Sequence, residues 1–257
     1  MYDEPYRWAE AIANRREYLD EQLRAGSPIV GITCQDGALL LTVGKGQRKI
    51  FEVYDRIAFA AIGHPADIEK LRNAAIDVAH VEGFHRSPAD VTLQRLVNFS
   101  LGPMMKRAFD EIIGSPYIAK VLMAELSFRT ETPLFYTVHY DGAFKSTERF
   151  AVIAGRDDAE QVMRNHVSRR EGKSLQPFHE ALCSALEAWS VGWIASRSEE
   201  LLSGEEAFPD DEIHETLRRE TGEGDVEAGL LTGARSGKNK FRSVTEAEIR
   251  SALARYL

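Results

Sequence analysis

Two clusters of lysine and glycine carry the residue types of a phosphate-binding loop. They are Gly44-Lys45-Gly46 and the segment from Gly233 to Asn239. Neither has the spacing of that motif, in which two glycines enclose four residues and a lysine and a hydroxyl residue follow. The second cluster also lies between two predicted strands, whereas the motif joins a strand to a helix. We therefore expect both clusters to be solvated turns, in which glycine supplies backbone freedom.

The remaining candidates for chemistry are histidines and cysteines. No two histidines have the spacing of a metal-binding pair on one helix face. The histidines are His64, His80, His85, His139, His166, His179 and His214. A nucleophile–histidine–acid triad built from distant segments stays open, although no Gly-x-Ser-x-Gly turn is present. Cys34 and Cys183 stand alone and fit buried free thiols. We expect neither a metal site nor a cofactor.

Composition narrows the class of protein. The 257 residues are 44% hydrophobic and 28% charged, as in an ordinary globular chain. The net charge of −8 disfavours general binding to nucleic acid, whose phosphates it would repel. The sequence contains no apolar run of about 18 residues, so no membrane-spanning helix is predicted. The first residues are charged throughout and lack the apolar centre of a signal peptide, which predicts a cytoplasmic protein.

Hydrophobic periodicity predicts the elements of the first half of the chain. A helix over Tyr6–Leu23 is followed by strands, with Asp36-Gly37 as a hairpin turn. The four predicted strands are Pro28–Cys34, Ala38–Val43, Lys49–Val53 and Arg56–Ile62. Two long helices follow. One covers Ala66–Gly83, and the other starts at Ser87-Pro88-Ala89-Asp90, an N-cap with proline at the first helical position, and extends to Ile112.

The second half repeats the alternation of strands and helices. Strands are predicted over Ala119–Phe128, Pro133–Tyr140 and Ser146–Ile153, helices over Asp157–Arg170 and Ser174–Ser196, and strands over Asp225–Leu231 and Lys240–Ser243. Residues 198–224 form an acidic segment that we expect to be a solvated insertion, part helix and part loop. Thr245-Glu246-Ala247-Glu248 has the pattern of a capping box and starts a final helix.

The grouping of these elements predicts the fold class. Strands come in antiparallel groups and helices in pairs, so the chain is α+β and has no βαβ alternation. Two stacked sheets with a helix pair on each outer face, a four-layer αββα sandwich, bury all the apolar faces. The predicted domains are residues 1–24, an N-terminal segment and helix, and residues 25–257, the sandwich with its acidic insertion.

The segment Gly26–His64 resembles proteasome subunits. It has their first strand, Asp-Gly turn, second strand, a lysine-led strand, and a strand that ends in a small-residue turn. Tyr54–Ala61 and the passage from Val81-Glu82-Gly83-Phe84 into Ala89-Asp90-Val91 resemble actinobacterial α subunits. The resemblance covers roughly residues 6–197 and 225–257. It implies the αββα sandwich of the Ntn-hydrolase superfamily.

The resemblance also separates α subunits from catalytic β subunits. A β subunit needs a free N-terminal threonine after a cleaved glycine, and the free amine helps to activate the nucleophile. The matching pair here is Gly26-Ser27, but Val43 stands where β subunits have an acidic residue, and of their catalytic groups only Lys49 remains. The resemblance therefore implies a subunit with no catalytic residue of its own in a threonine-type endopeptidase complex. Two alternatives stay open: a self-processed hydrolase with Ser27 as nucleophile, and a stand-alone proteasome-like homo-oligomer.

The α subunits implied by the resemblance keep a helix across the top of a heptameric ring. The residues before it converge on the axial pore, so Met1, Tyr2, Asp3, Glu4 and Pro5 are the expected gate. Glu4 stands where archaeal and eukaryotic α subunits carry arginine, a departure that affects the contacts of a closed gate.

In α subunits the lysine at the position of Lys49 lines a pocket that receives the C-terminal carboxylate of an activator. Gly63 matches a backbone position beside it, and a lysine ammonium suits a carboxylate. The partners implied are further copies of this chain in the ring, β subunits, an ATPase ring activator, and unfolded protein substrates in transit.

Overall fold

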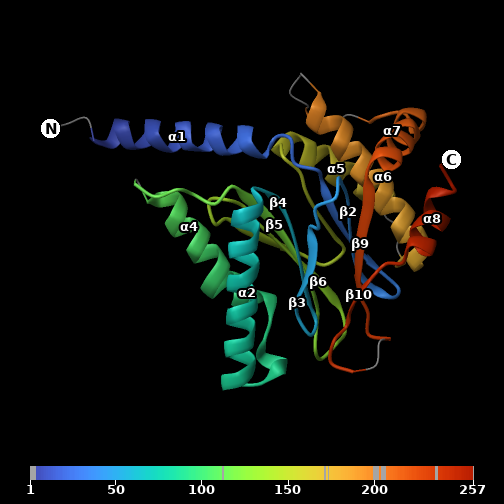
Figure 1. Cartoon of the computed structure of the whole chain (residues 1–257), viewed down its shortest axis with the longest axis horizontal. Coiled ribbons are helices and arrows are strands. Elements are labelled where there is room, and N and C mark those ends of the chain that lie inside the picture. The colour runs from blue at the N-terminus through green and yellow to red at the C-terminus, as the bar shows by residue number, and fades with distance from the viewer. Residues whose placement is uncertain are drawn as a thin grey trace.

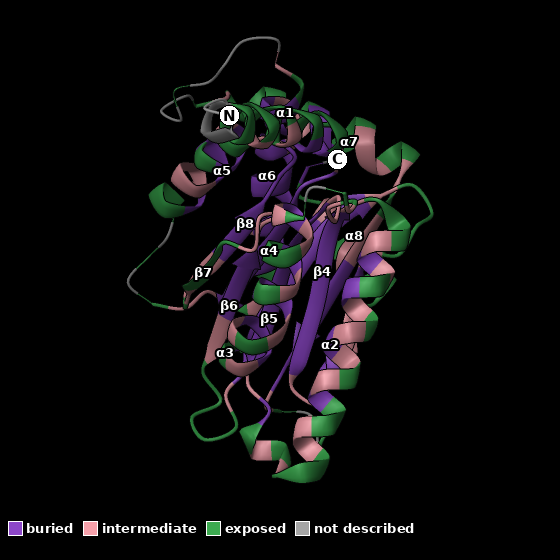
Figure 2. Cartoon of the chain, turned by 90° about the vertical axis from the view of Figure 1, so that its left-hand side faces the viewer, coloured by how far each residue is buried: buried purple, intermediate pink, exposed green. Residues whose placement is uncertain are grey.

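The computed structural model describes residues 4–111, 113–170, 172, 174–198, 203, 207–234 and 237–256, with side chains described from residue 7. Two antiparallel five-stranded sheets form its centre (Figures 1 and 2). The first has the order β10 (Phe241–Ser243), β9 (Asp225–Leu231), β2 (Gly37–Gly44), β1 (Ile29–Cys34) and β8 (Phe150–Ile153). The second has the order β3 (Ile50–Tyr54), β4 (Ile57–Gly63), β5 (Ala119–Leu126), β6 (Pro133–Val138) and β7 (Phe144–Thr147).

Helices cover the outer face of each sheet. Against the first sheet lie α5 (Asp157–Arg170) and α6 (Phe178–Arg197), with α7 (Asp210–Glu223) and α8 (Glu246–Leu253) packed on α6. Against the second lie α2 (Pro65–His85), α3 (Leu93–Leu96) and α4 (Gly102–Asp110). Three apolar cores fill the spaces between the four layers. Successive side chains of a strand point to opposite faces, so Leu39 and Leu41 face α6 whereas Leu40 faces the other sheet. The predicted αββα sandwich is confirmed.

Turn and cap signals in the sequence locate one hairpin and the start of one helix, although the turn residues are Gln35-Asp36, one position before the predicted Asp36-Gly37. Cys34 pairs with Gly37 across a two-residue turn, and Gly37 has φ = 136°, which favours glycine. The capping box at Thr245 and Glu248 is present and starts α8. No helix in the described parts of the chain has both the length and the apolar character needed to cross a bilayer.

The single strand predicted over Ser146–Ile153 is wrong. The chain bends at residues 148–149 and forms two short strands in different sheets: β7 pairs with β6, and β8 pairs with β1. The hydroxyl of Thr147 donates to the carbonyl of Phe150 across this bend at 2.6 Å. A run of strand-forming residues does not reveal that it passes from one sheet to the other.

The second long helix is interrupted. Ser87 caps only a single 3₁₀ turn, Pro88–Asp90, and the side chain of Thr92 caps α3. A π-helical stretch, Val97–Leu101, separates α3 from α4. Pro103 has no N–H to donate one turn back, and the Gly102 N–H bonds to the carbonyl of Val97, five residues earlier. The helix ends at Asp110, short of the predicted Ile112, which lies outside the described residues.

The described part of the acidic segment is packed on the body of the protein. Helix α7 starts at Asp210, with three acidic residues in its first turn, where they interact favourably with the helix dipole. Ile213 and Leu217 on its inner face are buried against α6. These apolar contacts tie α7 to the helix layer over the first sheet.

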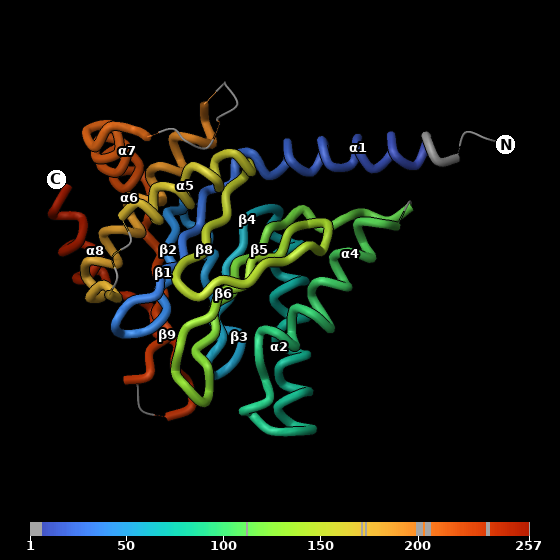
Figure 3. Tube along the Cα trace, turned by 180° about the vertical axis from the view of Figure 1, so that it is seen from behind, coloured from blue at the N-terminus to red at the C-terminus, as the bar shows by residue number. Residues whose placement is uncertain are grey.

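Helix α1 (Glu4–Leu23) projects from one end of the sandwich (Figures 1 and 3). Its C-terminal half is anchored: Ile12 packs against the core between the sheets, and Arg15 Nη1 donates to the carbonyls of Phe109 and Glu111. Leu19 and Leu23 are fully buried in the core between the sheets, and the hydroxyl of Tyr140 donates to Asp20 at 2.8 Å. Of the expected gate, Met1, Tyr2 and Asp3 lie outside the described residues, and Glu4 and Pro5 begin α1. Their role as a gate stays a prediction.

Replacing Leu23 with alanine tests how strongly α1 is anchored. Because this side chain is fully buried between the sheets, Leu23→Ala is expected to lower the free energy of unfolding by about 2–5 kcal/mol. Chemical denaturation followed by circular dichroism measures the change. Tyr18→Ala, at an exposed position of the same helix, is the control and should cost less than about 0.5 kcal/mol. Equal effects of the two variants would contradict this anchoring.

Candidate functional site

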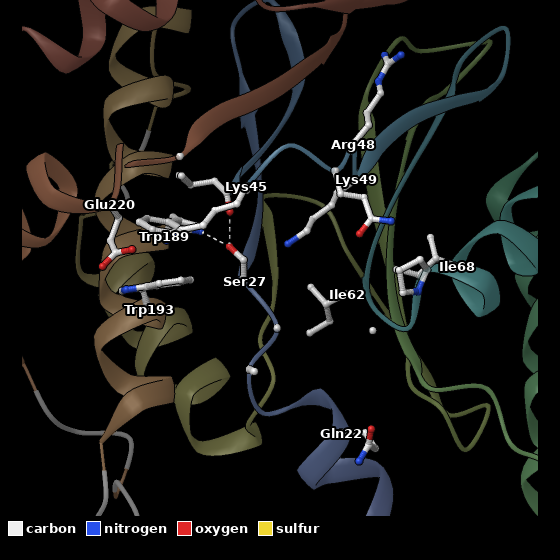
Figure 4. Close-up of a pocket in the computed structure, with 18 of the residues that line it drawn as sticks. Gln22, Ser27, Lys45, Arg48, Lys49, Ile62, Ile68, Trp189, Trp193 and Glu220 are labelled. Carbon is white, nitrogen blue, oxygen red and sulfur yellow. Dashed lines mark hydrogen bonds between the residues drawn. The ribbon is translucent and has the colours of Figure 1, made fainter. Parts of the chain in front are cut away.

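A cavity of about 430 Å³ opens at the end of the sandwich from which α1 departs (Figure 4). Its walls come from the start of β1, the ends of β2 and β4, the start of β3, and the helices α2, α6 and α7. Lys49 and Gly63 both line it, as does Ser27. The structure therefore brings the two predicted binding residues and the alternative nucleophile to one place.

The Ser27 hydroxyl is fully engaged in structural hydrogen bonds. Its Oγ donates to the carbonyl of Val43 at 2.6 Å and accepts from Nε1 of Trp189 at 3.0 Å (Figure 4). Thr42 Oγ1 lies 3.4 Å away. A serine nucleophile needs a base that takes its proton, but here the proton points at a peptide carbonyl, which is not a base.

No carboxylate among the described lining residues is placed to activate Ser27. Val43 stands at the position where the sequence comparison with β subunits expects an acidic residue. Its side chain is buried in the core between β2 and the helix layer. The two glutamates that line the cavity have other partners. Glu69 accepts three hydrogen bonds from Arg72, which hold its pKa below the ordinary value, and Glu220 pairs with Arg219. Neither of these two described glutamates forms a hydrogen bond with Ser27 or an ion pair with Lys49.

Lys49 extends its ammonium into the cavity toward Ser27 (Figure 4). Within the described parts of the chain, no group accepts a hydrogen bond or forms an ion pair with Lys49 Nζ. Burial lowers the pKa of Lys49, and the carboxylate of Glu227 raises it in part. A desolvated ammonium without a partner attracts an anion more strongly than an exposed one.

The other two cations that line the cavity have partners outside it. Lys45 pairs with Glu223 at 3.1 Å, and Arg48 lies 3.6 Å from Glu227. Both side chains are largely exposed, and Figure 4 shows Arg48 pointing away from the cavity. Lys49 is therefore the group that an entering carboxylate would meet.

Gly63 closes β4 in a conformation that requires glycine. Its φ is 131°, and an added Cβ would lie 2.0 Å from the carbonyl oxygen of Ile118. That carbonyl also accepts the N–H of His64 at 2.8 Å, and the His64 side chain caps α2. The small-residue turn predicted from the sequence thus brings the end of β4 and the start of α2 to the cavity edge.

Sequence reasoning missed the indole wall of the cavity. Trp189 and Trp193 of α6 stack at 5.1 Å between ring centroids, and both line the cavity. Nε1 of Trp193 is buried without a hydrogen-bond partner in the described structure. The signal in the sequence was a pair of large rings one helical turn apart in a helix rich in Ala and Ser.

Metal binding has no candidate cluster among the residues described. No group of three or more His, Cys, Asp or Glu side chains lies close enough together to hold an ion there. Both cysteines are buried and free, as the sequence predicted.

Comparisons with known proteins agree on one family. A family profile described as "Proteasome subunit" matches residues 23–190. The chain is 31% identical over 188 residues to "Proteasome subunit alpha" of Frankia casuarinae, covering 71% of this chain and 75% of that protein. It is 28% identical to the proteins of the same name from Thermomonospora curvata over 186 residues and Mycolicibacterium smegmatis over 190 residues, covering 71% of this chain and 79% and 75% of theirs.

Removing the hydroxyl of Ser27 should cost stability. Ser27→Ala leaves the buried N–H of Trp189 without its acceptor, so the free energy of unfolding should fall by about 1–3 kcal/mol. Trp189→Phe should cost a similar amount, and the double variant should cost less than the sum, because the two residues share one interaction. Chemical denaturation of all four proteins measures the coupling. Strict additivity would show that this hydrogen bond does not form.

Proposed function

Because this chain belongs to the proteasome subunit family, we propose that it is a non-catalytic α subunit of a 20S core particle. Seven copies form an outer ring, which closes the axial pore and docks an ATPase ring activator. Peptide bonds are cleaved by a β partner, to which the α ring admits unfolded substrates.

The observation that carries the non-catalytic assignment is the hydrogen bond from Ser27 to the Val43 carbonyl. A catalytic subunit needs a free terminal amine beside its nucleophile. In this chain the N–H of Gly26 donates to the carbonyl of Leu23 at 2.8 Å, which closes the end of α1 just before β1. The hydroxyl and the peptide N–H at this junction thus serve to hold α1 at the end of the sandwich.

The shape of α1 supports its place in a ring. The helix projects from the body (Figures 1 and 3), and Trp8 and Tyr18 on it are 45% and 53% exposed. Aromatic side chains are enriched at protein interfaces. A neighbouring copy of the chain is the proposed contact for this helix.

The ammonium of Lys49, which has no hydrogen-bond or ion-pair partner among the described residues, supports the docking role. The cavity combines one desolvated cation with an apolar wall of indoles and Ile62. A terminal carboxylate is the anion that a partner's tail supplies, and its last side chain can contact the apolar wall. The proposed ligand is the C-terminal tail of the activator.

Intact mass and peptidase activity test the non-catalytic assignment. The chain should keep its full-length mass, show no peptidase activity alone, and form an active particle when co-expressed with its β partner. A mass that begins at Ser27, with activity that Ser27→Ala abolishes, would establish instead a self-processed hydrolase. A stable ring that neither binds nor needs a β subunit would establish a stand-alone homo-oligomer.

Affinity for a carboxylate tests the docking role. The probe is a fluorescent octapeptide copied from the C-terminus of the same organism's ring ATPase, compared with its C-terminal amide. Lys49→Ala should weaken binding of the acid by at least about tenfold and leave the amide unaffected. Binding of the acid should be full below the pKa of Lys49 and weaken as the pH rises through it. Since burial lowers that pKa, the loss should begin at a lower pH than for an ordinary lysine. Equal affinities for acid and amide would contradict the role.

A further inference from the structure

Glu227 lies directly behind Lys49, on the other sheet. It belongs to β9 and pairs in register with Thr42 of β2. Its neighbours Val226 and Ala228 face the helix layer, so the alternation of the strand turns Glu227 toward the second sheet. It stands at the end of the sandwich where β3 begins.

The carboxylate of Glu227 binds the two peptide groups that carry Lys49 into β3. Its Oε2 accepts the N–H of Lys49 at 2.8 Å, and its Oε1 accepts the N–H of Ile50 at 2.9 Å. β3 is an edge strand, so Glu227 satisfies N–H groups at its start and joins it to the other sheet. A carboxylate that bonds two N–H groups at once fixes both the position and the direction of the backbone.

We propose that Glu227 is the positioning residue of Lys49: it clamps the first peptide groups of β3 and thereby aims the Lys49 ammonium into the cavity. The inference rests on the docking function proposed above and deepens it. Glu227 does not line this cavity, so it acts on a bound carboxylate only through Lys49.

The carboxylate of Glu227 also affects the protonation of Lys49 through its negative charge. The other charged residues that line the cavity come from the β2–β3 loop, α2 and α7: Lys45, Arg48, Glu69 and Glu220. Of these, Glu69 and Glu220 are paired with arginines of their own helices. Glu227 of β9 lies behind Lys49 and acts on its charge from there. Glu227 is the group whose charge raises the pKa of Lys49 against the effect of burial.

Two variants separate the effect of the Glu227 carboxylate's position at the two N–H groups from the effect of its negative charge. Glu227→Gln keeps the length of the side chain, loses the charge and replaces one acceptor oxygen with an NH₂ group. Glu227→Asp keeps the charge and withdraws it by one methylene from the two N–H groups. The matched control is Glu223→Gln, which removes the charge of an exposed glutamate that pairs with Lys45 on the same rim.

The first measurement is binding of the octapeptide acid and its amide to the assembled ring. Both Glu227 variants should weaken binding of the acid by about tenfold, as expected for the loss of a charge-assisted hydrogen bond. The amide should bind as before, and Glu223→Gln should bind the acid within about twofold of the parent protein. Thermal unfolding confirms that each variant is folded.

The second measurement does not depend on any tail. Trace acylation with acetic anhydride at a series of pH values, read for each lysine by peptide mass, gives the pH at which Lys49 loses its proton. The neutral amine attacks the anhydride, an amide bond forms, and acetate and a proton leave. The midpoint of Lys49 should move to lower pH in Glu227→Gln, stay near the parent value in Glu227→Asp, and not move in Glu223→Gln.

The outcomes distinguish this inference from the docking function. Failure of the parent protein to prefer the acid over the amide overturns the docking function, on which the inference rests. A parent preference that both Glu227 variants retain in full overturns the inference alone. An unmoved Lys49 midpoint in folded Glu227→Gln also overturns it, because a merely structural contact leaves that midpoint unchanged.

Discussion

The hydroxyl of Ser27 joins three elements that the rest of the site depends on. It lies at the start of β1, donates to the carbonyl of Val43 in β2, and accepts from Trp189 in α6. These bonds fix the end of the first sheet against its helix layer, and α1 departs from the same point. A carboxylate in place of Val43 would compete for the hydroxyl proton. With valine there, the hydroxyl keeps its hydrogen bond to the Val43 carbonyl and joins β2 to α6.

The hydrogen bonds from the start of β3 to Glu227 join the two sheets beside the cavity and explain why the cavity suits an anion. The inner core between the sheets is apolar, but at this end Glu227 of the first sheet bonds the start of β3 in the second. Burial disfavours the charge of Lys49, while Glu227 supports it. The cavity therefore holds a charged lysine that lacks a direct ion-pair partner in the described structure, which is the condition for binding a carboxylate from outside.

Local signals predicted much of the fold, and packing decided the rest. Asp36-Gly37 and the capping box at Thr245 identify their turn and helix because a few neighbouring residues determine each. The break between β7 and β8 could not be predicted, since the change of sheet depends on pairing with strands far away in the chain. Lys49 and Gly63 were predicted as site residues through the family resemblance, and the structure places both at one cavity. Glu227 and the indole wall were missed because they contact the site only across sheets and layers, which no spacing along the chain records.

The proposed α-subunit role of this chain can be tested with a high-resolution electron cryo-microscopy map of the particle that it forms with its β partner. We expect the chain in an outer seven-membered ring, with unbroken density from α1 through Gly26 into β1 and the Ser27 hydroxyl within hydrogen-bond distance of the Val43 carbonyl. Density that begins at Ser27, with its hydroxyl facing an inner chamber, would show instead that this chain is a catalytic subunit.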